Sequence, residues 1–492
     1  GLQPLGYQPV RGELMQKVGN KPYISVNYTF DGLTPAGLPE DLCYKLNQYY
    51  EQKLRQDKTA HDKIEFEIIF NTYDFMTDTR LKELAEYGFD DVEISQLRNA
   101  LFEIAKQTLE HYDEICEEDL RSLGQLTELR HELRKHSPLA ETNVMKLYSY
   151  IDELLDSIKD HGTPQFTRQA RCAFMARSFC RTLVEKGYFT KQEMDDFMLS
   201  IPTVASEFER DFDLYSHGKL SRDDFNHLYG HLRLGTYDIR SDSYRNIYFD
   251  VASANLTGNN KVKQEAKSLD LERLQVALDE AGIPVTPEKF IEFIKKATQN
   301  REYFKFEFTK SLSLMLDVIV KLGEVMAIAR EDMSYLEIQD LLSYHSRDSY
   351  IQTIETRRRF YHVNSYLVLP EVIFDVGDID VIDIDEARPN FITNKVVEAP
   401  IVNLDEDHDS DITGKIVVLT KADPGYDWIF AKDIAGFVTK YGGAASHMAI
   451  RCAEFGIPAA IGCGEKIYQR IHRMQIMCLD CENGRITEKQ SQ

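Results

Sequence analysis

The sequence has little positive charge and no long apolar run. It holds 58 lysines and arginines against 81 aspartates and glutamates, a formal net charge of −23. This excess repels phosphates and argues against nucleic acid or an anionic membrane as a partner, but not against a small anion in a local basic pocket. The apolar run "LSLMLDVIV" is short and contains Asp317. With no signal peptide in view, we expect no membrane contact and a cytoplasmic location.

Cysteines are also few, with eight in 492 residues, and they show no dense framework. This pattern predicts free thiols in a reducing compartment. An apolar content of 43% is ordinary for a globular protein with a real core. The length suggests about three domains. Because the chain starts at Gly1 without a methionine, we expect it to be a fragment of a longer protein.

Hydrophobic spacing predicts two kinds of domain. Apolar residues recur at three- and four-residue intervals over 92–115, 165–187 and 301–326, so we expect a mainly helical domain over 1–370. Residues 371–391 are acidic and β-branched and are interpreted as a linker. From 392 to 492, short apolar runs alternate with turns and two helical stretches. The predicted fold class is multidomain, α+β and α/β, with a small α/β domain last.

One histidine stands behind a loop with almost no side chains, in "KYGGAASHMAIRCAEFGIPAAIG". Ser446 suits a helix N-cap, which places His447 in the first helical turn. The positive end of the helix dipole favours the neutral, nucleophilic imidazole and also an anion attached to it. Gly442 and Gly443 leave space for a phosphate, and Arg451, one turn on, could hold its oxygens. These are the needs of a covalent phosphohistidine carrier. A structural histidine is the alternative.

The same string resembles the phosphohistidine segment of the phosphoenolpyruvate synthase and pyruvate phosphate dikinase family. It has the GG, the S-H-x-A-I and the G-I-P-A of the mobile, swivelling domain of that family. The family commonly has arginine six residues after the histidine, where this chain has Ala453, and the arginine here is Arg451. The resemblance implies that an ATP-grasp domain phosphorylates His447 and that the swivelling domain delivers the phosphoryl group to an acceptor.

Neither an ATP-grasp pattern nor the repeat of a pyruvate-binding barrel is evident. We therefore expect ATP and Mg²⁺ to bind to an ATP-grasp domain in the same gene product or a separate subunit, and the isolated fragment not to turn over ATP. Segments such as 61–73, 200–212 and 229–244 resemble the capsular polysaccharide-cluster branch, which includes an L-glutamine kinase. That branch implies phosphorylation of the amide nitrogen of glutamine, with AMP and phosphate as co-products. A rifampin-type antibiotic phosphotransferase and a non-enzymatic phosphocarrier or regulatory module remain alternatives.

A charged loop is the second informative stretch, "YGHLRLGTYDIRSDSY" at 229–244. With the resemblance in hand, we interpret it as shaping the site of a small polar acceptor, and a solvated turn is the alternative. The candidate acceptor-binding residues are His231, Arg233, Tyr237, Asp238 and, more weakly, Arg301 on a helical face. The histidine pairs at 131 and 136 and at 227 and 231, and the cysteine pair at 478 and 481, each lack further ligands at suitable spacing, so no metal site is expected.

Overall fold

The computed structural model describes residues 1–233, 237–246, 268–364, 369–375, 389–406, 410–421, 424–443, 446–472 and 474–489. The chain forms two compact units, one made of 1–208 and 262–367 and the other of 209–261 and 368–492. The sequence analysis assigned 209–261 to the first domain, whereas here they group with the C-terminal part. Most of the predicted linker, 376–388, lies outside the described residues.

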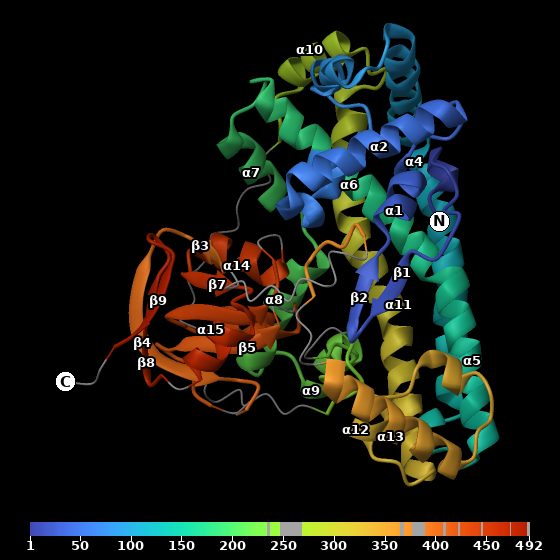
Figure 1. The fold of residues 1–492 in the computed structure, drawn as a ribbon, viewed down its shortest axis with the longest axis vertical. Coiled ribbons are helices and arrows are strands. Elements are labelled where there is room, and N and C mark those ends of the chain that lie inside the picture. The colour runs from blue at the N-terminus through green and yellow to red at the C-terminus, as the bar shows by residue number, and fades with distance from the viewer. Residues whose placement is uncertain are drawn as a thin grey trace. The chain divides into compact units, whose positions relative to one another are not determined.

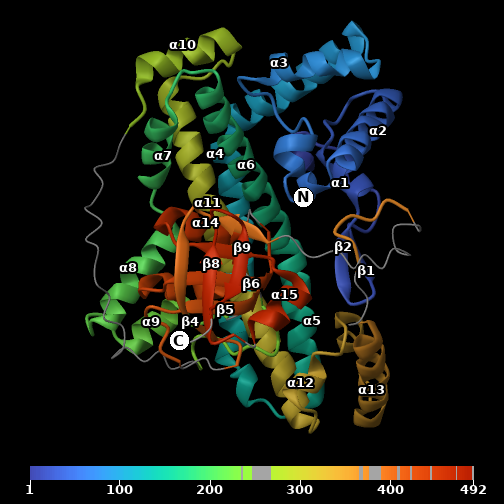
Figure 2. The ribbon, with the colours of Figure 1, turned by 60° about the vertical axis from the view of Figure 1, so that its left-hand side comes forward.

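The first unit is built around long helices (Figures 1 and 2). Helix α11 packs along α4, α5 and α6. The described helices are α1 (Val26–Leu33), α2 (Glu40–Gln56), α3 (Thr77–Arg80), α4 (Asp91–Lys135), α5 (Val144–His161), α6 (Thr163–Glu185), α7 (Lys191–Leu199), α10 (Leu271–Ala281), α11 (Pro287–Val325), α12 (Arg330–Met333) and α13 (Arg347–Asn364), with the start of α8 (Val204–Ser216). Short 3₁₀ turns are η1 (Gln3–Leu5), η2 (Lys58–Asp62), η4 (Leu81–Tyr87), η5 (Pro138–Ala140) and η7 (Ile338–Leu341), and η3 (Ile64–Ile68) is a π-helix.

Local sequence explains where these helices begin. Asp90 caps α4 in a capping box with Glu93, and Thr286 caps α11 just before Pro287, a residue well suited to a first helical turn. The three predicted helical stretches are confirmed as parts of α4, α6 and α11. The stretch "KPYISVNYTF" at 21–30 has the composition of a strand, but only its first part forms one. Strand β2 (Lys21–Ile24) pairs with β1 (Met15–Val18), but Ser25 then caps α1, so a good N-cap overrides β-propensity.

The second unit contains a seven-stranded sheet in the order β3-β7-β6-β5-β4-β8-β9. Its strands are β3 (Asn390–Ile392), β4 (Val396–Asn403), β5 (Ile416–Lys421), β6 (Gly436–Tyr441), β7 (Ala459–Ile461), β8 (Ile476–Asp480) and β9 (Arg485–Glu488). Strands β4, β5, β6 and β7 are parallel neighbours, whereas β3, β8 and β9 pair antiparallel. The Asn483-Gly484 dipeptide, which favours a tight hairpin turn, lies between the antiparallel strands β8 and β9.

Alternation along the central strands produces two cores. Val417 and Leu419 of β5 face one core with α14 (His447–Phe455) and the turn η9 (Pro424–Ala431). Ile416 and Val418 face the other, with α15 (Gly464–Ile471). A strand that is buried on both faces is expected to be a continuous apolar run, and β5 begins with the run "IVVL". The predicted fold class, helical plus α/β, is confirmed.

All eight cysteines are free thiols. Among the described residues, no helix combines the length and apolar character needed to cross a bilayer.

Candidate functional site

His447 is the first residue of α14, at the end of the loop that follows β6. The Ser446 hydroxyl accepts a hydrogen bond from the backbone N–H of Ala449 at 3.3 Å, and the Ser446 N–H donates to the carbonyl of Gly443 at 3.0 Å. The predicted N-cap is therefore confirmed. The helix ends at Gly456, in the left-handed conformation that favours glycine. The His447 side chain is 34% exposed and so reaches solvent.

Steric constraints explain why glycine occurs at two positions near the start of α14. Gly442 has φ of +133°, a region that residues with a Cβ rarely adopt. Gly462, after β7, has φ of +76°, and a Cβ there would collide with the carbonyl oxygen of Gly442. Two loops thus touch through backbone atoms alone beside the start of α14. Space for a phosphate at Gly442 and Gly443, expected from the sequence, remains a prediction.

A carboxylate holds the imidazole of His447. Both carboxylate oxygens of Asp427, in η9, lie 2.7 Å from its Nε2 atom. The Asp427 side chain is only 15% exposed, so little water screens this ion pair. The carboxylate stabilises a positive charge on the ring and orients it, which opposes the effect of the helix dipole.

Sequence reasoning missed Asp427, although a signal for it exists. η9 follows β5 and the histidine loop follows β6, and these strands are parallel neighbours. Loops after the carboxyl ends of adjacent parallel strands meet at one edge of a sheet. A polar residue soon after β5 was therefore a candidate to meet His447.

Arg451 lies one turn after His447 and is engaged by carboxylates. Its side chain is 13% exposed and forms ion pairs with Glu209 of α8 and, at 3.1 Å, with Glu454. Its Nε atom lies 4.0 Å from Asp427 and has no hydrogen-bond partner. The guanidinium also lies over the ring of Phe455 at 4.9 Å. Arg451 and His447 thus both lie beside Asp427, while contact of Arg451 with a phosphate remains a prediction.

The charged loop lies in the same unit as His447. His231 and Arg233 are buried, at 5% and 3% exposure, and Arg233 donates to the carbonyl of Ser241 at 2.7 Å. The Asp238 carboxylate pairs with Arg240 and lies 3.9 Å from Lys421. Residues 234–236 lie outside the described residues.

The end of this loop reaches the turn that carries Asp427. The Tyr244 hydroxyl donates to the carbonyl of Gly425 in η9. Tyr237 is half-buried, with φ of +49°, in the left-handed region. The loop therefore supports η9, and a contact with an acceptor remains a prediction for Tyr237 as for the other loop residues.

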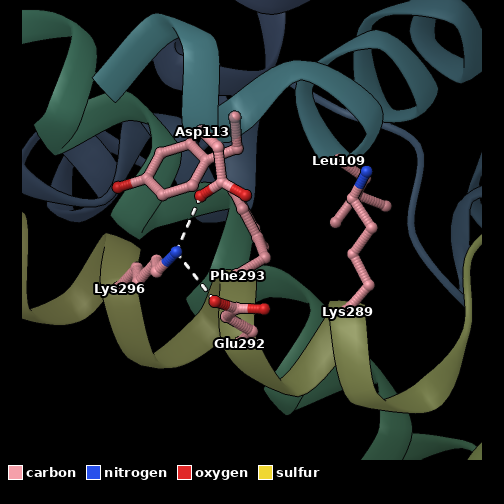
Figure 3. Close-up of a pocket in the computed structure, with 7 residues that line it drawn as sticks. Leu109, Asp113, Lys289, Glu292, Phe293 and Lys296 are labelled. Carbon is pink, nitrogen blue, oxygen red and sulfur yellow. Dashed lines mark hydrogen bonds and ion pairs between the residues drawn. The ribbon is translucent and has the colours of Figure 1, made fainter. Parts of the chain in front are cut away.

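Arg301 belongs to the other unit, on α11, and is not grouped with the loop residues. Two hollows of that unit also lie on α11. The one in Figure 3 has about 10 Å³, room for about one water, and Lys296 there pairs with Asp113 and Glu292, each at 2.8 Å. The second, of about 450 Å³, is lined by residues of α10 and α11 and by Ser268, and none of the predicted site residues lines it.

The comparisons with known proteins agree with the sequence motif. Residues 412–484 match the family described as PEP-utilising enzyme, mobile domain. The chain is 28% identical over 222 residues to a rifampicin phosphotransferase of Bacillus subtilis, covering 41% of this chain and 24% of that protein. It is 26% identical over 212 residues to a rifampicin phosphotransferase of Bacillus cereus, covering 39% and 24%. The matched stretches span about a quarter of the length of these curated relatives.

Proposed function

We propose that this chain is the acceptor-binding and phosphohistidine portion of a phosphotransferase, with His447 as the covalent phosphate carrier. The observation that carries the proposal is the placement of His447 at a capped helix N-terminus behind a glycine loop, with Asp427 on its Nε2 atom. The match of 412–484 to a PEP-utilising mobile domain supports the same assignment.

Asp427 has a definite task in this reaction. In the imidazolium form both ring nitrogens carry a proton, so Nε2 can attack phosphorus only after it has lost its proton, while Nδ1 keeps its own. The carboxylate at 2.7 Å is placed to take that proton. A nitrogen–phosphorus bond then forms, and the bond from phosphorus to the leaving oxygen of the donor breaks. The phosphoryl group then occupies the position beside Nε2 that Asp427 holds, so the protonated Asp427 side chain turns away as the group arrives.

The phosphoryl donor belongs outside this chain in our proposal. We assign ATP and Mg²⁺ to an ATP-grasp domain in the same gene product or a partner subunit. Arg451 would bind the phosphoryl oxygens on His447 once its carboxylate partners are displaced.

The acceptor we propose is a small polar metabolite, specifically the amide nitrogen of L-glutamine, with AMP and phosphate as co-products. The resemblance of segments such as 61–73 and 229–244 to the glutamine kinase branch supports this choice. A rifampicin-type acceptor is the second candidate, because both curated relatives carry that name. The two acceptors differ in charge and size and are separable by direct assay.

The test uses a chemical phosphoryl donor and the enzymatic one. Phosphoramidate transfers its phosphoryl group to reactive histidines, so the chain alone should acquire acid-labile, base-stable phosphate on His447, located by mass spectrometry. With the ATP-grasp domain, ATP and Mg²⁺ added, the same histidine should be labelled, and L-glutamine or rifampicin should discharge it. Labelling of a different histidine, or phosphorylation of the acceptor without loss of the His447 phosphate, would refute the proposal.

A further inference from the structure

Helix α6 carries a stripe of arginines interrupted by one aromatic residue. Arg171, Phe174, Arg177 and Arg181 are spaced by three, three and four residues, so they share one face of the helix. This is unusual in a chain with a net charge of −23. Arginines placed together repel one another, and such a stripe therefore needs a compensating partner.

Two other elements of the same unit add to this face. Phe66, of the π-helix η3, packs edge-on against Phe174 with 5.6 Å between ring centroids. The guanidinium groups of Arg177 and Arg181 lie 5.4 and 5.8 Å from the Phe66 ring. Arg301 of α11, which runs along α6, lies 5.4 Å from the Phe174 ring. Short π-helices are rare and frequently occur at functional sites.

Some of these arginines have structural partners. Arg171 is buried, with 2% of its side chain exposed, and donates to Glu65 of the π-helix at 2.6 Å. Its remaining nitrogens, Nε and Nη1, are buried without a hydrogen-bond partner. Arg181 donates to the carbonyl of Phe66 at 3.4 Å and has the Glu185 carboxylate at the same distance. These contacts tie η3 to α6 but leave donors unused.

Structural contacts of this kind do not account for Arg177 and Arg301. Arg177 is exposed, and no carboxylate pairs with it among the described residues. Its pKa is lowered by desolvation and by the positive charges of Arg301 and Arg181. Arg301 has only the Glu302 carboxylate at 3.4 Å, and its side chain is 43% exposed. Two solvent-accessible guanidinium groups thus converge on a pair of aromatic rings.

We propose that this arginine cluster, formed by Arg171, Arg177, Arg181 and Arg301, binds an anionic oxygen group, a carboxylate or a phosphate, of the acceptor molecule. The inference rests on the proposed function and narrows its acceptor to a class. Guanidinium groups match carboxylate and phosphate oxygens with paired, charge-assisted hydrogen bonds. The Phe66 and Phe174 rings hold the arginines in place through cation–π contacts. The α-carboxylate of an amino acid fits this chemistry, whereas a large apolar acceptor does not require it.

The experiment measures binding to the chain directly, without phosphoryl transfer. Calorimetric titration uses L-glutamine, L-glutaminamide, which lacks the α-carboxylate, and inorganic phosphate. Arg177→Gln removes the exposed, unpaired charge and should leave the fold intact. Arg359→Gln, an exposed arginine of α13, is the matched control. If the carboxylate is the ligand, glutamine binds and glutaminamide does not. Arg177→Gln then weakens the affinity for glutamine about tenfold or more. If phosphate is the ligand, inorganic phosphate binds instead, and Arg177→Gln weakens the binding of phosphate.

The outcomes separate this inference from the proposed function. Equal affinity of Arg177→Gln and Arg359→Gln for every probe, or no saturable binding of any probe at millimolar concentration, would overturn the arginine site even if His447 is phosphorylated. The converse result is anion binding that depends on these arginines in a chain whose His447 is not phosphorylated by phosphoramidate. That result would support the anion-binding site and refute the proposed phosphotransferase function. Arg301→Gln provides a second variant on a different helix and should show the same loss as Arg177→Gln.

Discussion

Replacing Asp427 with asparagine should slow the phosphorylation of His447 about a hundredfold. The amide keeps the shape of the carboxylate and can still contact the ring, but it cannot take the Nε2 proton. A positioned general base contributes about 10²- to 10⁴-fold to a rate. The His447 side chain is 34% exposed, so water can partly replace the base, and the lower end of that range applies. A factor of about 10² corresponds to about 2.7 kcal/mol in the activation barrier.

The assay follows the mass of the intact chain over time after addition of phosphoramidate. Asp433→Asn is the matched control, since Asp433 is an exposed aspartate of the same unit. It should react at the wild-type rate. Thermal unfolding of both variants checks that neither has lost its fold. An Asp427→Asn chain that is folded and phosphorylated as fast as the control would refute the assignment of Asp427 as proton acceptor.

The remaining predictions concern the same domain. His447→Asn should stay folded, because the side chain is partly exposed, and should lose both half-reactions, which a discharge assay with the ATP-grasp domain measures. Arg451→Ala should slow phosphoryl transfer about tenfold to a hundredfold without abolishing it, because charge-assisted contacts contribute about 1.5–3 kcal/mol. An unchanged rate in single-turnover kinetics would exclude Arg451 as a phosphate ligand. Gly462→Ala should destabilise the domain by about 3 kcal/mol in urea unfolding, because its positive φ and the Gly442 carbonyl both oppose a Cβ. Gly414→Ala shares the positive φ but has open space around it, so it should cost only about 1 kcal/mol. Equal losses in these two variants would contradict the close approach.

What the sequence could predict around His447 was local. The Ser446 cap, the stop at Gly456 and the buried face of Met448 and Cys452 all follow from spacing within a dozen residues. Asp427 could not be found in this way, because it lies 20 residues before His447 and outside any periodic pattern. Its contact depends on two strands pairing, which only the sheet order reveals.

The helical unit shows the same limit. Arg301 was noticed on a charged helix face, but the neighbours that give it meaning come from elsewhere in the chain, as Phe174 of α6 does. The 62–75 stretch interrupts the run of helices and could be a strand from its sequence alone. Instead it forms the π-helix Ile64–Ile68, tied to α6 by the ion pair between Glu65 and Arg171. A tertiary ion pair of this kind has no signature in the local sequence.

The division of the second unit between two distant stretches of sequence has a consequence for synthesis of the protein. Residues 209–246 are synthesised about 120 residues before the rest of the second unit, which begins at 368. At about 5–20 residues per second, this delay lasts about 6–24 s. During that time the Tyr244 ring, 2% exposed in the finished fold, has no β-sheet domain to pack against. The helical unit is therefore completed around an unfinished insertion, and ribosome-bound chains that stop before β5 should expose this segment to chaperones and proteases.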